Sequence, residues 1–196
     1  MMKYCTVLFT ALCTLCFLSS ASAQGVELRA AAGISQPFRN HQADQPSGFL
    51  LLPGLRYRTA NRRIAVGVDC NYNYFDFEND PDLSYTIYGY VGSFEYYLRD
   101  DDFHVYIGLS TGYFDIQQDV GLPGTGGSAI STSAWGLTPR GGIDYELSHS
   151  ISAYADFGFR ILFKSDGAAG SGRNDGFVDA AFGLSFKLYK SGPRGL

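Results

Sequence analysis

Residues 178–189 read VDAAFGLSFKLY and alternate between two kinds of side chain. The even positions from Val178 to Leu188 are all apolar, whereas the odd positions from Asp179 to Lys187 are small, polar or charged. A period of two is typical of a β-strand, because successive side chains point to opposite faces of the sheet. The stretch therefore predicts a strand with one wholly apolar face.

The same alternation recurs along the chain, and no helical period of useful length interrupts it. The alternating segments are residues 26–35, 49–58, 64–74, 85–98, 103–113, 135–147, 151–164 and 178–189. Each segment is long enough to cross a bilayer as a tilted strand, which takes roughly 9–11 residues. The pattern therefore predicts eight strands.

The connections between these segments alternate between long and short. The long ones are residues 39–47, 77–83, 118–130 and 167–175, and the short ones are residues 59–63, 99–102 and 147–150. Outer-membrane barrels have tight periplasmic turns and longer external loops. The predicted fold class is therefore all-β, an eight-stranded antiparallel up-and-down transmembrane β-barrel with both ends in the periplasm. The glycine-rich stretches 121–128 and 167–172 are expected to form flexible extracellular loop tips.

The composition agrees with a β protein and excludes two other classes. Hydrophobic residues make up 45% of the 196 residues, which is too high for a disordered chain. Charged residues reach only 17%, while the chain holds 24 glycines and 15% aromatic residues, a composition typical of strands. The net charge of −4 argues against binding to nucleic acid, which requires a basic surface.

The first residues have the pattern of a secretory signal peptide. Lys3 precedes an uncharged apolar run over residues 4–18, and Ala21-Ser22-Ala23 is a small-residue cleavage site. We therefore expect residues 1–23 to be removed and residues 24–196 to form the barrel domain. Cys70 then becomes the last remaining cysteine, so an internal disulfide is excluded and the residue is interpreted as a small apolar strand residue.

Two eight-stranded architectures fit this alternation, and the charges on the polar face distinguish them. A soluble barrel exposes its polar face to water, whereas a transmembrane barrel encloses it. The bases on this face are almost all arginine, whose planar fork suits enclosed ion pairs with carboxylates. The charged residues assigned to the lumen are Glu27, Arg29, Arg56, Arg58, Asp69, Glu95, Arg140, Asp144, Glu146, Asp156, Arg160, Asp179 and Lys187.

We therefore predict that the apolar face contacts lipid and that the lumen is plugged by paired charges. With eight strands the interior has room for side chains and little else. Three alternatives stay open at this point: a narrow channel, a soluble exported ligand-binding barrel, and an enzyme on the same barrel.

The chain resembles the small eight-stranded outer-membrane barrels of the OmpX/Ail and OmpA-barrel group over its whole mature length. The last strand carries the nearest approach to a motif, since Gly183, Phe186 and Leu188 resemble the signal read by the barrel-assembly machinery. Residues 190–196 follow this strand, which departs from the family pattern of an aromatic C-terminal residue. The resemblance implies an outer-membrane location in a Gram-negative-type bacterium and contact with membrane lipid and lipopolysaccharide. It also implies roles in envelope integrity, adhesion or host-factor binding through the loops.

One group of acidic residues is a candidate metal site. Asp76, Glu78, Asp80 and Asp82 alternate around the second long connection, and carboxylates at this density can bind Ca²⁺ or Mg²⁺. The stretch lacks the glycine and the later glutamate of a calcium loop, so a solvated acidic loop explains it better. We expect no metal and no cofactor.

An enzyme acting on lipid A would require a histidine near the outer leaflet with a serine and a carboxylate. His41 lies near Asp44 and Ser47 in the first long connection, and this trio is the one arrangement to test. His104 and His149 fall at the predicted periplasmic end, away from the outer leaflet. The chain is expected not to be an enzyme.

Overall fold

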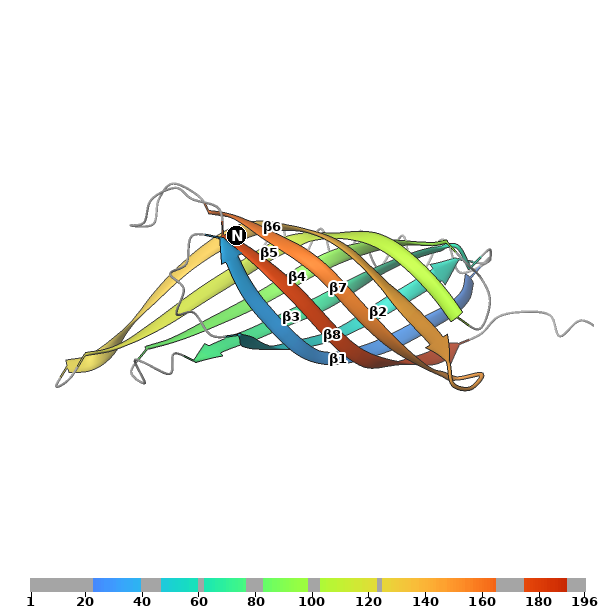
Figure 1. Ribbon diagram of the computed structural model, residues 1–196, viewed down its shortest axis with the longest axis horizontal. Coiled ribbons are helices and arrows are strands. Elements are labelled where there is room, and N and C mark those ends of the chain that lie inside the picture. The colour runs from blue at the N-terminus through green and yellow to red at the C-terminus, as the bar shows by residue number, and fades with distance from the viewer. Residues whose placement is uncertain are drawn as a thin grey trace, which may run out of the picture.

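The computed structural model describes residues 23–39, 47–59, 62–76, 83–98, 103–122, 125–164 and 175–189. These residues form eight antiparallel strands that close into one barrel in sequence order, as predicted (Figure 1). The strands are β1 (Ala23–Arg39), β2 (Gly48–Thr59), β3 (Ile64–Asp76), β4 (Leu83–Tyr97), β5 (Phe103–Leu122), β6 (Thr125–Glu146), β7 (Ile151–Lys164) and β8 (Asp175–Tyr189). β1 pairs with β8, so the sheet has no free edge along its closed part.

Tight turns join the strands at the end where β1 begins. We call this the periplasmic end and the opposite end the extracellular end, as the sequence predicts. The backbone N–H of Arg62 donates to the carbonyl of Thr59 at 2.9 Å, and Arg62 adopts the left-handed conformation with φ of 55°. In the turn between β6 and β7, the hydroxyl of Ser148 accepts from the backbone N–H of Ile151 at 3.2 Å. Such local hydrogen bonds allow a strand to reverse within a few residues.

The outer surface of the barrel is apolar. Tyr90 is 73% exposed, Phe182 65% and Leu188 62%, and every strand contributes large apolar side chains to this surface. Among the described residues, no helix is long and apolar enough to cross a membrane. A soluble barrel would bury this face, so the structure contradicts that alternative and supports the predicted lipid-facing side.

The extracellular half of the lumen holds an apolar cluster that the alternation did not predict. Its members, which come from the six strands β3 to β8, are Phe75, Ile87, Val91, Phe114, Ile116, Ala134, Leu162 and Phe177. The interior is therefore not polar throughout. The sequence signal is a pair of adjacent large apolar residues, such as Tyr113-Phe114, which makes a strand apolar on both faces at that point.

The prediction of a long loop over residues 118–130 is wrong. β5 and β6 continue as a paired hairpin as far as Leu122 and Thr125, and the intervening residues are Pro123 and Gly124. In Figure 1 this yellow hairpin projects well beyond the rest of the barrel at the left. An antiparallel pair satisfies its own backbone groups, so it persists where the composition alone suggests a loop. The stretch 121–128 is therefore largely strand rather than a flexible tip.

Candidate functional site

Every charged residue assigned to the lumen lies at an inward-facing position. Arg140, Glu146 and Lys187 are partly exposed as residues, and the others are buried. Each buried arginine of the set contacts at least one carboxylate, as described below. Pairing of this kind is required because an isolated charge in a low-dielectric interior costs several kcal/mol.

Asp144 on β6 joins two arginines in the periplasmic half of the lumen. Its Oδ2 accepts from Nη2 of Arg29 at 3.0 Å and from Nη2 of Arg58 at 3.0 Å. The guanidinium of Arg58 also lies 4.0 Å from the ring centre of Tyr97, and that of Arg29 lies 4.3 Å from the ring centre of Tyr154. The aromatic rings therefore cover the faces of the guanidinium groups, while their edges bind carboxylate.

Glu27 and Glu95 complete the charge balance of this half. Nη1 of Arg56 donates to Oε2 of Glu95 at 2.5 Å, and Nε of Arg58 lies 3.5 Å from Oε1 of Glu27. The hydroxyl of Ser185 on β8 donates to the other oxygen of Glu27 at 3.2 Å. The network therefore links strands on opposite sides of the barrel.

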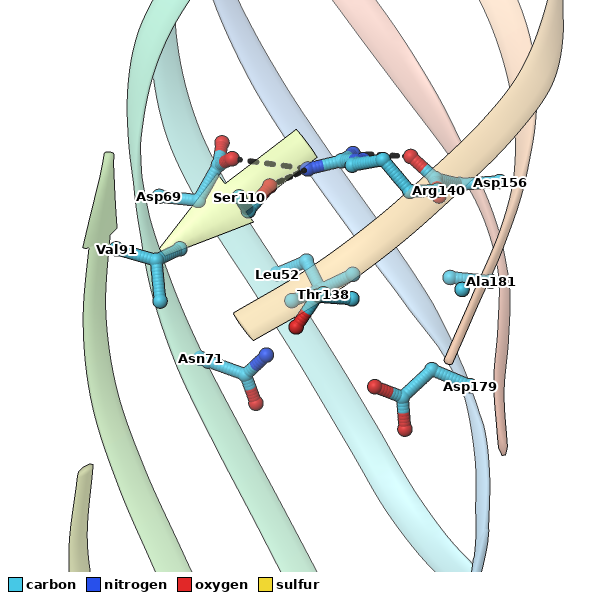
Figure 2. A pocket seen from close by; sticks show the side chains of 11 residues that line it. Leu52, Asp69, Asn71, Val91, Ser110, Thr138, Arg140, Asp156, Asp179 and Ala181 are labelled. Atoms are coloured by element: carbon cyan, nitrogen blue, oxygen red, sulfur yellow. Dashed lines mark hydrogen bonds and ion pairs between the residues drawn. The ribbon is translucent and has the colours of Figure 1, made fainter. Parts of the chain in front are cut away.

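Arg140 spans the middle of the lumen between two aspartates, as Figure 2 shows. Its Nη1 donates to Oδ2 of Asp69 at 3.1 Å and to the hydroxyl of Ser110 at 3.2 Å, and its Nη2 donates to Asp156. A cavity of about 30 Å³ lies next to this bridge, toward Asn71 and Asp179. A polar cavity of that size has room for about two water molecules.

Arg160 marks the boundary with the apolar cluster. Its Nε and Nη2 bind both oxygens of Asp179 at 2.6–3.0 Å, and its Nη2 also donates to Oδ1 of Asn73 at 3.0 Å. The guanidinium lies 5.5 Å from the ring centre of Phe114 and 5.3 Å from that of Phe177. Beyond these two rings, toward the opposite end from the start of β1, the described lumen is lined mainly by the apolar cluster.

The periplasmic mouth carries the remaining pair of the predicted set. Nζ of Lys187 contacts Oε1 of Glu146, and Nε2 of His104 lies 3.6 Å from the same oxygen. The ring of His104 packs edge-on against Tyr97. Lys187 and Glu146 are both partly exposed, so this pair faces the periplasmic water.

Gly183, from the proposed assembly signal, has a clear role in closing the barrel. A Cβ atom at this position would lie 2.2 Å from the carbonyl oxygen of Ala30 on β1. Any side chain would therefore collide with the neighbouring strand at the β1–β8 seam. Phe186 and Leu188 lie on the exposed outer face, and nothing in the geometry tests whether the assembly machinery reads them.

The candidate metal and catalytic groups are only partly within the described residues. Asp76 is exposed at the end of β3, whereas Glu78, Asp80 and Asp82 lie outside the described residues. Within the described part of the chain, no group of acidic, cysteine or histidine side chains could hold a metal ion.

The candidate catalytic trio of His41, Asp44 and Ser47 is also only partly within the described residues. His41 and Asp44 lie outside the described residues, and the hydroxyl of Ser47 donates to Oε1 of Gln36 at 2.5 Å. His149 is exposed in the short turn between β6 and β7, and His104 is buried near the periplasmic mouth. No histidine of the described residues therefore lies at the extracellular end.

The β5–β6 hairpin presents a second candidate site outside the lumen. β7 pairs with β6 only as far as Ala134, which is opposite Lys164. Within the described part of the chain, residues 125–133 of β6 therefore pair with β5 on one side and with no strand on the other. We call this segment the free edge.

Comparison with known proteins supports the fold and assigns no function to the chain. No protein-family model and no curated protein matches the chain. The structure is similar to that of Neisserial surface protein A, with a TM-score of 0.66, 17% sequence identity, and coverage of 85% of this chain and 99% of that one.

Two further solved structures give the same result at lower similarity. A major outer membrane protein from Thermus thermophilus has a TM-score of 0.55 at 13% identity, covering 85% of this chain and 100% of that one. The outer membrane protein AlkL, solved in lipid bilayers, has a TM-score of 0.51 at 14% identity, covering 89% and 94%. The closed strand order, the apolar exterior and these likenesses together identify the fold as that of the small eight-stranded outer-membrane β-barrels.

Proposed function

We propose that the protein is an integral outer-membrane barrel with a closed lumen, inserted after removal of its signal peptide. Its function is contact with other proteins at the cell surface through the β5–β6 hairpin. The observation that carries this proposal is the edge of β6 over residues 125–133, which pairs with no strand of the described residues on that side and belongs to the hairpin that projects beyond the barrel wall.

Between Ser128 and Ser133 the free edge lacks the features that usually protect an exposed strand, and the register of the ladder shifts only nearer the tip, between Val120 and Leu122 of β5. Residues 125–133 read TGGSAISTS and contain no proline and no charged residue. Natural edge strands are commonly blocked by charges, prolines or bulges, because their unpaired N–H and C=O groups can pair with another chain. An unblocked edge favours addition of an extended peptide as a further strand. The expected partner is therefore an extended segment of a protein at the cell surface.

The barrel supports this function as a rigid base. The β5–β6 ladder runs without a break from Phe103, at the periplasmic end, to Val120 in the projecting part. The edge is therefore held at a fixed orientation, which reduces the entropy lost when a partner binds.

The filled lumen supports a role in envelope integrity rather than transport. Charged pairs occupy its periplasmic and middle parts, and the apolar cluster occupies its extracellular part. The cavity beside Arg140 holds only about 30 Å³. A barrel filled in this way adds a surface element without opening a path for solutes.

Selection of peptides from a phage-displayed library on the protein in nanodiscs tests the surface-contact function. Replacing residues 119–129 with Asn-Gly would end the hairpin at the pair Gln118–Ile130, because Asn-Gly favours a two-residue turn. Peptides selected on the wild type should lose binding to this shortened variant. The control, Pro123→Asn, retains the length of the hairpin and should bind as the wild type does. Equal binding to the shortened variant would refute the proposal.

A further inference from the structure

A hollow on the outer face of the barrel lies where the β5–β6 hairpin leaves the wall. It is lined by Tyr88 and Tyr90 of β4, Tyr113 and Asp115 of β5, and Ser131 and Ser133 of β6, and its volume is about 360 Å³. We call it the tyrosine groove. It lies outside the lumen, on the lipid-facing surface at the base of the hairpin, and shares Ser131 and Ser133 with the lower end of the free edge. The membrane placement proposed above is the one assumption on which its interpretation rests.

The strand register places the groove at the level of the lipid headgroups. Tyr90, Tyr113 and Trp135 are neighbours across β4, β5 and β6, and their exposed rings form part of an aromatic belt. Such belts mark the boundary between hydrocarbon and water. Asp115 and Ser133 are cross-strand neighbours one step further toward the extracellular end. The polar side of the groove therefore lies just outside the hydrocarbon.

Asp115 gives the groove its hydrogen-bonding character. The hydroxyl of Ser131 donates to Oδ1 of Asp115 at 3.0 Å, which leaves Oδ2 to accept from a ligand. None of the described residues that line the groove is an arginine or a lysine, so among them a phosphate group would meet the like charge of Asp115 without a basic partner. A ligand rich in hydroxyl donors matches the carboxylate and the serine hydroxyls instead.

The tyrosines supply flat apolar surfaces beside these acceptors. Tyr90 is the most exposed large apolar side chain among the described residues, at 73%. The ring of Tyr88 packs against that of Tyr72 on the neighbouring strand β3, with 5.2 Å between the ring centres. The negative face of an aromatic ring attracts the slightly positive C–H bonds of a saturated sugar ring. The rings therefore fit the C–H face of a sugar, and the carboxylate fits the hydroxyl groups at its edge.

The surface below the groove has room for an attached hydrocarbon chain. Gly92 follows Tyr90 on the same face of β4, and a Cβ atom there would have only the carbonyl oxygen of Thr111 within 4 Å, at 3.9 Å. The position of Gly92 therefore presents no side chain to the lipid directly beneath the tyrosines. An acyl chain can pass over Gly92 while its headgroup occupies the groove.

We propose that the tyrosine groove binds the sugar headgroup of a glycolipid in the outer leaflet. Asp115 accepts hydrogen bonds from the sugar hydroxyls, Tyr90 and Tyr113 stack on the ring, and the acyl chain lies over Gly92. The ligand class is defined by hydroxyl donors without a requirement for phosphate or ammonium.

Fluorescence of Trp135 provides a direct readout, because it is the one tryptophan of the chain and the cross-strand neighbour of Tyr113. The protein is placed in phosphatidylcholine nanodiscs that contain increasing amounts of glucosyl-diacylglycerol. Parallel series contain phosphatidylglycerol or phosphatidylethanolamine with the same acyl chains. We expect a saturable shift of the Trp135 emission with the glycolipid alone.

Three variants separate the groove from a general effect of the aromatic belt. Asp115→Asn keeps the size of the side chain and should weaken binding about tenfold, since it removes a charged acceptor. Tyr90→Ala should also weaken binding. Tyr96→Ala removes an outer-face tyrosine of the same strand near the periplasmic end and should leave binding unchanged. Heat-dependent migration on SDS gels checks that each variant is folded.

Four results would overturn this inference. Two of them are a shift of the Trp135 emission with phosphatidylglycerol or with phosphatidylethanolamine as large as that with the glycolipid. The third is unchanged glycolipid binding by Asp115→Asn. The fourth is an equal emission shift with free glucose, which would show that the lipid part is not required. The peptide selection described above does not depend on the groove, so the two proposals fail separately.

Discussion

The two halves of the lumen are filled in opposite ways. In the periplasmic half, Arg29, Arg58 and Asp144 form a charged network covered by tyrosine rings. In the extracellular half, Phe114, Leu162 and their neighbours form an apolar cluster like the core of a soluble protein. The first half depends on pairing between buried charges and the second on close packing. We therefore expect the two halves to lose stability for different reasons: the charged half when a partner is removed, and the apolar half when a cavity is created.

Removing one carboxylate from the charged half should have the largest effect. Asp144→Ala leaves Arg29 and Arg58 buried without their shared acceptor, and we expect a loss of about 3–5 kcal/mol in the free energy of unfolding. Urea unfolding in phospholipid vesicles measures it. Asp76→Ala, at an exposed strand end, is the matched control and should change stability little. A loss for Asp144→Ala no greater than that of the control would show that the network is not required.

Truncating the apolar half should cost somewhat less. Leu162 is fully buried in the cluster, and Leu162→Ala should lower the free energy of unfolding by about 3 kcal/mol through lost transfer energy and a cavity. The same unfolding assay applies. Phe163→Ala alters the next residue, which faces lipid, and serves as the control. Equal losses of free energy of unfolding in the two variants would show that the cluster does not pack as a core.

The boundary between the halves allows a sharper comparison. Arg160 lies against the rings of Phe114 and Phe177 and pairs with Asp179, so the double variant Arg160→Met, Asp179→Leu places apolar side chains next to the apolar cluster. Replacing a buried ion pair by apolar residues of similar volume is often neutral or stabilising. The double variant also removes the partners of buried Ser35 and Asn73, so we expect a moderate loss of about 1–3 kcal/mol in the free energy of unfolding. The single variant Asp179→Leu should instead be strongly destabilising, and equal losses in the two variants would contradict this account.

The smallest expected signal is ion conductance, because charged pairs and the apolar cluster occupy the lumen formed by the described residues. We expect no defined current steps when the protein is inserted into planar bilayers. Shortening two rings of the cluster, with Phe114→Ala and Phe177→Ala together, tests the extracellular seal separately. Regular steps in the wild type would favour the narrow channel.

The sequence predicted the strand count, the lipid-facing side and the inward position of every charged residue assigned to the lumen. These properties follow from the period of two and from the chemistry of the polar face. It did not predict the apolar cluster, because the alternation was expected to place polar residues inside over the full length of each strand. Adjacent apolar pairs at Tyr74-Phe75 and Tyr113-Phe114 carry that information.

The pairing of residues within the charged network and the length of the β5–β6 hairpin could not be predicted from the sequence. Arg29 and Asp144 are separated by 115 positions, and their contact depends on the stagger of strands around the barrel. Nothing local in the sequence fixes that stagger. The hairpin was misassigned because glycine and serine over residues 121–128 suggest a loop, although Pro123-Gly124 marks a turn between paired strands.

Migration on SDS gels, before and after heating, directly tests whether the protein forms a closed barrel in the outer membrane. A closed barrel resists SDS until heated, because its strand ladder has no open edge within the membrane. We predict that the protein is recovered in the outer-membrane fraction and migrates differently before and after boiling. A protein found in the soluble fraction, with identical migration in both samples, would contradict the account.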